Sequence, residues 1–244
     1  MTSSPPIDNI KLNPLSQHLT SEVIRSRLKD KNISFVANDN IADYIEPGEI
    51  EKLEEEVADR FRDLLKSLII DIENDHNTQE TAERVARMYI NEVFKGRFHK
   101  QPKVTSFPNV KKLDEIYTVG PMTIRSACSH HFVPIIGNCW IGIKPGNRVI
   151  GLSKFSRVAD WVFSRPHIQE EAVMILADEI ERLCEPQGLG IIVKADHYCM
   201  KLRGVKESNC SMINSVVRGD FRHDPSLKQE FFELVRQQET ALTR

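Results

Sequence analysis

Three side chains suited to metal binding stand out by their type and spacing. A thiol and an imidazole lie three residues apart in the segment Cys128-Ser129-His130-His131, and a second thiol, Cys199, follows much later in the chain. Zinc prefers sulfur and nitrogen donors in tetrahedral geometry, and a close pair of ligands joined by a distant third is typical of its sites. The sequence therefore predicts zinc on Cys128, His131 and Cys199.

Two further histidines, His130 and His197, lie beside these ligands. A catalytic zinc keeps one position open for water, whereas a structural zinc would take His130 or His197 as a fourth ligand. Because imidazole exchanges protons near neutral pH, the spare histidines favour catalysis. The spacing alone leaves two alternatives open, a structural zinc and buried thiols with no metal.

A cluster of basic residues could bind an anion. Ser153, Lys154 and Arg157 open an expected helix directly after a strand, where free N–H groups and the helix dipole favour phosphate. Arg203 follows Cys199 by four residues, and Arg84 lies at another expected helix start. Each of them, taken alone, also fits a solvated surface cation.

An amide and a carboxylate, Gln169 and Glu170, lie side by side near the start of a later expected helix. Together they offer the donors and acceptors needed to bind the edge of a guanine or a similar base. The alternative is an ordinary polar helix face that also includes Glu171.

The elements that must position these residues follow from hydrophobic periodicity and turn signals. Strands grouped before and after a pair of helices predict an antiparallel α+β fold. Gly96 is the expected end of the second helix, Ser153 the N-cap of the third, and Pro166 the first residue of the fourth. In chain order we expect helices over 49–72 and about 81–95, strands within 116–152, helices over 153–164 and 166–183, strands over 188–202 and 211–221, and a helix over about 225–237.

The bulk composition sets outer limits on function. The chain has 244 residues, 40% of them hydrophobic, and a net charge of −2, so it has no overall positive field for nucleic acid or a membrane. Five cysteines are an odd number and do not indicate a disulfide framework, which favours a reducing cytoplasm. We expect neither a secretory signal nor a membrane span.

The expected organisation has three parts. Residues 1–47 are rich in Pro, Ser, Asn and Asp, which is typical of a mobile arm, with one short helical pattern over 21–31. Residues 48–112 form a predicted helical region, and residues 113–244 a predicted catalytic domain.

Five segments of the chain form one ordered set of motifs, namely SACSHHFVPIIG, VIGLSKFSRVADW, RPHIQEE, ADHYCMKLRGVKES and GDFRHD. Together they resemble the GTP cyclohydrolase I family, a family of zinc hydrolases that act on cyclic amidine C–N bonds. The resemblance covers about residues 53–234 and implies the tunnelling fold, in which an antiparallel sheet carries two helices on one face. It also implies a homodecamer of two pentamers, with active sites between subunits and GTP as the substrate.

The resemblance implies a reaction and a role for each candidate residue. GTP would be hydrolysed at C8 to formate and 7,8-dihydroneopterin triphosphate, the first step of pterin and tetrahydrofolate biosynthesis. The implied zinc ligands are Cys128, His131 and Cys199, and the implied proton-handling residues are His130, His197 and Ser153. The implied contacts to guanine, ribose and triphosphate are Gln169, Glu170, Ser153, Lys154, Arg157, Arg203 and, from a neighbouring subunit, Arg84.

The sequence also departs from the family pattern. Ser129 stands where the family has Glu, Ala82 where it has Pro, and His167 where it has Gln, which we interpret as a neutral replacement at a polar helix position. Three alternatives therefore accompany the GTP cyclohydrolase I prediction. They are a diverged purine-nucleotide hydrolase with a different product, a reductase of the same fold without zinc, and a non-catalytic zinc protein.

Overall fold

The structure is a computed structural model that describes residues 19–241. The first 18 residues of the predicted arm lie outside the described residues. The described chain divides into two compact units, one formed by residues 19–35 with Asp43–Ile90, the other by Val36–Ala42 with residues 91–241. The domain boundaries predicted at residues 47 and 112 stay a prediction.

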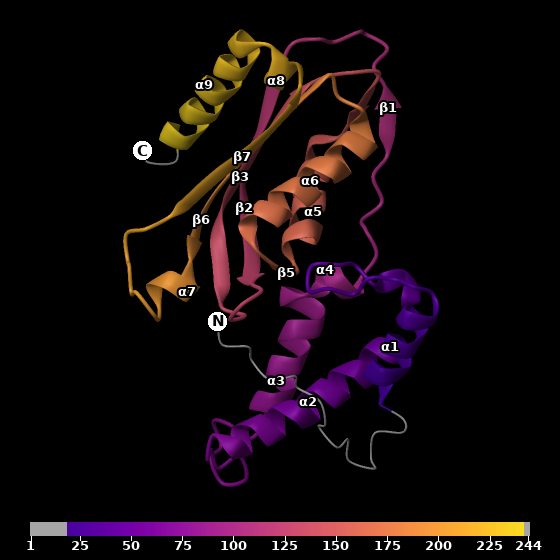
Figure 1. Ribbon diagram of the computed structural model, residues 1–244, viewed down its shortest axis with the longest axis vertical. Helices are drawn as coiled ribbons and strands as arrows, with labels where there is room; N and C mark the ends of the chain where they lie inside the picture. The colour runs from indigo at the N-terminus through magenta and orange to yellow at the C-terminus, as the bar shows by residue number, and fades with distance from the viewer. Residues whose placement is uncertain (1–18, 242–244) are drawn as a thin grey trace, which may run out of the picture. The chain divides into compact units, whose positions relative to one another are not determined.

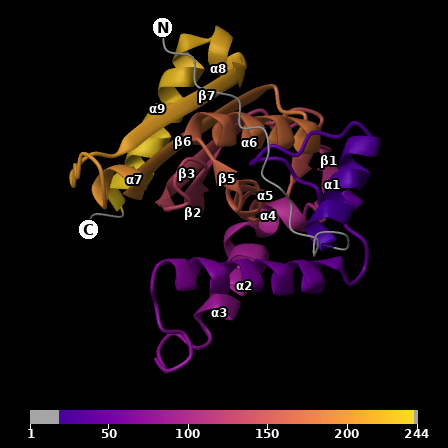
Figure 2. The ribbon, with the colours of Figure 1, turned by 60° about the horizontal axis from the view of Figure 1, so that its bottom comes forward.

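The first unit is helical. It contains α1 (Thr20–Asp30), α2 (Glu49–Ser67) and α3 (Thr81–Met88). A short 3₁₀ turn, η2 (Ala42–Tyr44), precedes α2, and a π-helical turn, η3 (Tyr89–Val93), continues α3. Helix α2 packs against α3 (Figure 2). The rings of Phe61 and Tyr89 stack with their centroids 5.9 Å apart. The expected helix over 49–72 is too long, because Ile69 adopts a left-handed φ of 60° that ends the helical path.

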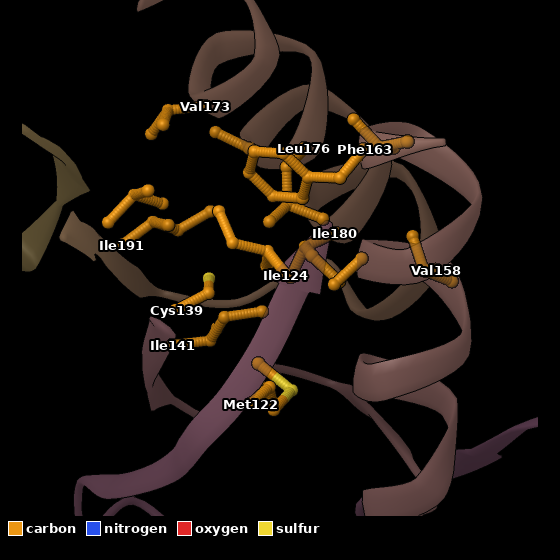
Figure 3. Close-up of a cluster of buried hydrophobic side chains, with 14 of the residues drawn as sticks. Met122, Ile124, Cys139, Ile141, Val158, Phe163, Val173, Leu176, Ile180 and Ile191 are labelled. Carbon is orange, nitrogen blue, oxygen red and sulfur yellow. The ribbon is translucent and has the colours of Figure 1, made fainter. Parts of the chain in front are cut away.

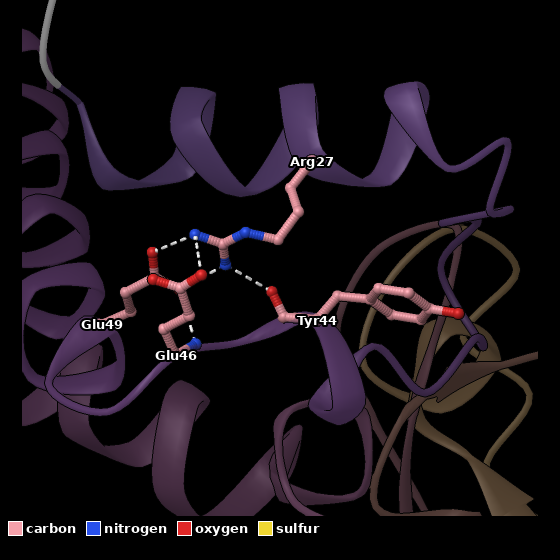
Figure 4. A network of polar contacts seen from close by, with 4 residues as sticks. All are labelled: Arg27, Tyr44, Glu46 and Glu49. Atoms are coloured by element: carbon pink, nitrogen blue, oxygen red, sulfur yellow. Dashed lines mark hydrogen bonds and ion pairs between the residues drawn. The ribbon is translucent and has the colours of Figure 1, made fainter.

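A polar network ties α1 to the start of α2 (Figure 4). Two nitrogens of Arg27 each donate to a different carboxylate oxygen of Glu49 at 2.8 Å, and Arg27 also donates to the Tyr44 carbonyl at 2.6 Å. Glu46 adds an ion pair at 3.2 Å. The hydrogen bond from Arg27 lowers the pKa of Glu49, so the carboxylate stays charged at neutral pH.

The second unit is built on a five-stranded sheet in the order β5-β2-β3-β6-β7 (Figure 1). All neighbours are antiparallel except β5 and β2, which are parallel. A separate two-stranded ribbon joins β1 to β4. The strands are β1 (Ser106–Pro108), β2 (Tyr117–Cys128), β3 (Pro134–Lys144), β4 (Arg148–Ile150), β5 (Pro166–His167), β6 (Gly188–His197) and β7 (Met212–Gly219), and the helices are α4 (Lys95–Phe98), α5 (Leu152–Phe163), α6 (Gln169–Cys184), α7 (Tyr198–Lys201), α8 (Asp220–His223) and α9 (Pro225–Ala241).

Helices α5 and α6 cover one face of the sheet and enclose the main core. Alternate residues of a strand point to the same face, so Ile124, Ile141 and Ile191 of β2, β3 and β6 all project toward these helices. Figure 3 shows them meeting Leu176 and Ile180 of α6. The predicted α+β class, with two helices on one face of an antiparallel sheet, is confirmed.

Helices α8 and α9 cover the opposite face of the sheet (Figures 1 and 2). The ring of Phe231 lies directly on the backbones of Gly142 and Gly190, where any Cβ would collide with it. Phe231 stacks on Phe221 with ring centroids 5.5 Å apart, next to the buried Trp140. The two glycines therefore fix how closely α9 approaches the sheet.

Three expected helix boundaries were wrong. Helix α5 begins at Leu152 with Gly151 before it, so Ser153 lies inside the helix and is not its N-cap. Pro166 belongs to β5, which pairs with the end of β2, and α6 begins only at Gln169. Gly96 does not end a helix but lies within α4, where it packs against the Trp161 carbonyl. Among the described helices, none combines the length and apolarity needed to cross a membrane.

Candidate metal centre and active site

The turn between β2 and β3 presents two of the predicted zinc ligands. Cys128 is the last residue of β2, and its N–H donates to the Val133 carbonyl at 2.9 Å, which closes the turn. Phe132 adopts a left-handed φ of 53°, which reverses the chain before β3 begins at Pro134. This path leaves Cys128 buried and His131 exposed.

The third predicted ligand arrives at the same end of the sheet. Strand β6 ends at His197, which is the register partner of Ile135 at the start of β3. Helix α7 begins one residue later and carries Cys199, partly buried, toward the β2–β3 turn. Antiparallel pairing of β3 with β2 and β6 thus unites residues far apart in sequence.

The donor atoms of Cys128, His131 and Cys199 all lie within 4.8 Å of one another. In a tetrahedral zinc site, ligand atoms are separated by about 3.3–3.8 Å, so the three donors could close on a zinc ion with movements of at most about 1–1.5 Å. Two sulfur donors and one nitrogen donor suit zinc and leave a fourth position for a small molecule. Burial and the neighbouring Cys128 raise the pKa of the Cys199 thiol.

Arg203 contacts one of the three candidate metal ligands. Its guanidinium donates to Nε2 of His131 at 2.6 Å. The rings of His130 and His131 are 6.3 Å apart, so His130 is adjacent to the cluster, and it is exposed. The structure therefore brings Arg203 and both histidines to the end of the sheet that carries the three donor atoms.

Gln169 and His197 form a direct contact beside the same cluster. Nε2 of His197 lies 2.8 Å from Oε1 of the buried Gln169. Burial lowers the pKa of His197, and the nearby carboxylates of Glu170 and Asp196 partly oppose this shift. Glu170, the next residue of α6, is exposed. The predicted contact of Gln169 with guanine stays a prediction.

His167 occupies a different environment from the one expected. It lies on β5 as the register partner of Cys128, not on a helix, and it is buried. A ring nitrogen, Nε2, lies 2.6 Å from the Val162 carbonyl, and burial lowers the pKa of His167 to about 4. The ring is therefore neutral at pH 7 and belongs to the packing behind Cys128.

The remaining predicted anion-binding residues belong to helices α5 and α3, not to the β2–β3 turn or α7. Ser153 and Arg157 are exposed on α5, and Lys154 donates to the Lys103 carbonyl at 3.2 Å. Arg84 lies on α3 of the first unit, where it pairs with Glu80 at 2.8 Å. Their joint action on a triphosphate stays a prediction.

Sequence reasoning missed one residue of this region, Asn214 on β7. Its side chain accepts a hydrogen bond from Gln169 at 2.7 Å. No metal-ligand or anion-binding pattern includes an isolated Asn in a strand. Only the pairing of β7 with β6 shows that it lies opposite Val193 and therefore near Gln169.

A mostly antiparallel sheet that joins two thiols and an imidazole, with two more histidines and an arginine beside them, defines an α+β protein with a candidate metal-binding site. The sequence profile described as GTP cyclohydrolase I matches residues 57–236. The chain belongs to the GTP cyclohydrolase I family and is an enzyme of that family, with its tunnelling fold.

Individual relatives agree with this assignment. GTP cyclohydrolase 1 of Erwinia tasmaniensis is 34% identical over 181 residues, covering 74% of this chain and 81% of that protein. GTP cyclohydrolase 1 of Haemophilus ducreyi is 35% identical over 181 residues, with 74% and 83% covered. The protein of the same name from Aliivibrio salmonicida is 32% identical over 187 residues, with 76% and 86% covered.

Proposed function

We propose that the chain hydrolyses GTP to formate and 7,8-dihydroneopterin triphosphate, with one zinc ion held by Cys128, His131 and Cys199. The observation that carries this proposal is the convergence of their three donor atoms within 4.8 Å, in a chain of the GTP cyclohydrolase I family. A bound zinc would lower the pKa of a water molecule toward neutrality and so provide a nucleophile for C8 of the guanine ring.

The protein's own residues would handle the protons and hold the substrate. His130, exposed beside His131, would exchange protons with the purine imidazole ring as it opens. His197 would serve a second transfer, and Ser153 a later one at the ribose. Glu170, an exposed carboxylate next to Gln169, can accept hydrogen bonds from the N–H groups of guanine.

The triphosphate would be bound by Lys154, Arg157, Arg203 and Arg84. The first turn of α5 adds the N–H groups of a helix N-terminus, which favour negative charge. Arg84 of α3 would act on the zinc site of a neighbouring subunit in a homodecamer of two pentamers. Assembly of this kind would also pair the open edges of the sheet at β5 and β7. A cytoplasmic location, where thiols stay reduced, belongs to the same proposal.

The test is to incubate the purified protein with GTP, after its zinc content has been measured, and to follow formate and oxidised pterin fluorescence together. The proposal expects both products in a ratio of about one to one. A ring-opened formamide without formate would instead indicate the diverged hydrolase. Absence of any nucleotide turnover by the zinc-loaded protein would overturn the proposed function.

A further inference from the structure

The side chain of Gln169 has its hydrogen-bonding groups engaged inside the protein. It is 2% exposed and stands at the first position of α6. Its nitrogen Nε2 donates to Oδ1 of Asn214 at 2.7 Å and to the Val193 carbonyl at 3.2 Å. Its oxygen Oε1 lies 2.8 Å from Nε2 of His197. A side chain held in this way has little capacity left for a ligand.

The Val193 carbonyl decides which way the amide of Gln169 points. A carbonyl oxygen only accepts, so the amide nitrogen must face it, and the amide oxygen must then face His197. Since an amide oxygen also only accepts, Nε2 of His197 carries a hydrogen. The remaining ring nitrogen, Nδ1, is then the atom of His197 that is left to exchange a proton with a substrate.

Three elements hold this arrangement in place. Val193 and His197 lie four residues apart on β6 and therefore project from the same face of the sheet, toward α6. Asn214 on β7 is the register partner of Val193, so both partners of the Gln169 nitrogen are set by the β6–β7 pairing. Gln169 thereby links α6, β6 and β7 to the ring of His197.

We propose that Gln169 is a positioning residue, anchored by Asn214, which fixes the ring orientation and tautomer of His197 and does not bind guanine. The inference rests on the proposed function, because it assigns His197 a proton transfer in that reaction. Fixed donors and acceptors around a proton-transferring imidazole act on the chemical step more than on substrate binding. Loss of the contact should lower kcat and leave KM nearly unchanged.

The test compares Gln169→Met with the wild-type holoenzyme. Methionine matches the length of glutamine but cannot accept the hydrogen bond of His197. We expect kcat to fall about 10- to 100-fold, with zinc content unchanged. The KM for GTP and the inhibition constant of 7-deaza-GTP, which lacks N7, should stay within about twofold. The preference for GTP over ITP, which lacks the 2-amino group, should also persist.

Two further variants keep the inference testable if Gln169→Met fails to fold. Gln169→Glu retains an acceptor for His197 but loses the donor to the Val193 carbonyl, so its kcat should lie between those of Gln169→Met and the wild type. Asn214→Ala should lower kcat about three- to tenfold, and its effect should not add to that of Gln169→Met, because both act through one contact. Ser215→Ala, next along β7 on the opposite face, is the matched control and should match the wild type.

A direct guanine contact would give a different pattern. In that case Gln169→Met would raise the inhibition constant of 7-deaza-GTP tenfold or more, the preference for GTP over ITP would collapse, and Asn214→Ala would be silent. That pattern would overturn the inference while leaving the proposed function intact. If the wild-type protein released no formate from GTP, the proposed function itself would fail, whatever the variants did.

Discussion

His130 and His131 are adjacent in the β2–β3 turn but have separate proposed roles. The Nδ1 or Nε2 of His131 belongs to the group of three donor atoms, whereas His130 lies beside this group and is exposed. Removing an adjacent proton carrier should affect turnover without releasing the metal, because three protein ligands remain.

For His130→Ala we therefore expect an unchanged zinc content and a kcat lower by about 10²-fold or more. Metal analysis and formate release on the same preparation check both parts. The exposed His99 lies on the loop after α4, and His99→Ala serves as the matched control with wild-type turnover. Full turnover by His130→Ala would remove His130 from the proton-transfer role.

Residue types and short spacing predicted the grouping of Cys128, His131 and Cys199, because C-x-x-H fixes two donors locally. The position of Cys199 beside the β2–β3 turn depends on how the strands pair. The sequence predicts the strands but not their pairing. The partners of Gln169 were beyond prediction, since the contact with Asn214 depends on the register of β6 and β7. A register is set by the whole sheet, not by neighbouring residues.

At the scale of elements, the packing of α9 on the sheet rests on one buried ring. Phe231 has no exposed surface and lies on the glycine backbones of β3 and β6. Phe231→Ala should lower the free energy of unfolding by about 3–5 kcal/mol, because the cavity cannot close over the fixed glycines. Phe232→Ala, at the next and 36% exposed position, should cost well under half as much. Urea denaturation followed by circular dichroism measures both, and equal losses would contradict this view of the packing.

The link between α1 and α2 predicts a dependence of stability on pH. The folded state lowers the pKa of Glu49, so its stabilisation is present above the ordinary pKa of about 4.3 and is lost as pH falls through the lowered value. Arg27→Met should weaken α1 by about 2 kcal/mol at pH 7 and by much less once the pH lies below the lowered pKa of Glu49.

Hydrogen exchange of the α1 amides measures this local stability. The control is Arg25→Met, because the contact of Arg25 among residues 19–241 is an exposed ion pair with Glu22 on its own helix. It should change exchange rates by less than about twofold. An effect of Arg27→Met that did not diminish as the pH fell through the lowered pKa of Glu49 would show that the Glu49 carboxylate is not its cause.

Hydrophobic periodicity and turn signals predicted which segments form helices and strands, but they did not predict where these elements begin and end. Strand-type segments within 116–152 and over 188–202, bounded by turn signals, predicted β2 and β6. Pro166 predicted a helix start by local preference, yet pairing with β2 placed it in a strand. Helix α2 ends before the expected residue 72, because Ile69 adopts a left-handed backbone conformation that no local sequence pattern indicated.

At the scale of the whole molecule, the core of the second unit does not depend on the metal site. The hydrophobic cluster beneath α5 and α6 extends along four strands, and of the three metal-type residues only Cys128 is buried in it. Removal of zinc by a chelator should therefore abolish formate release while the far-ultraviolet circular dichroism stays within about 10% of the original. Unfolding on chelation would instead identify the zinc as structural.

The most direct measurement compares zinc content and formate release from GTP in the wild-type protein and in Cys128→Ser and Cys199→Ser. If Cys128, His131 and Cys199 hold a catalytic zinc, the wild type carries about one zinc per chain and releases formate. Each serine variant should lose most of its zinc and at least about 10²-fold of its turnover, because two remaining ligands hold zinc weakly. A serine variant that kept both its zinc and full turnover would contradict the account.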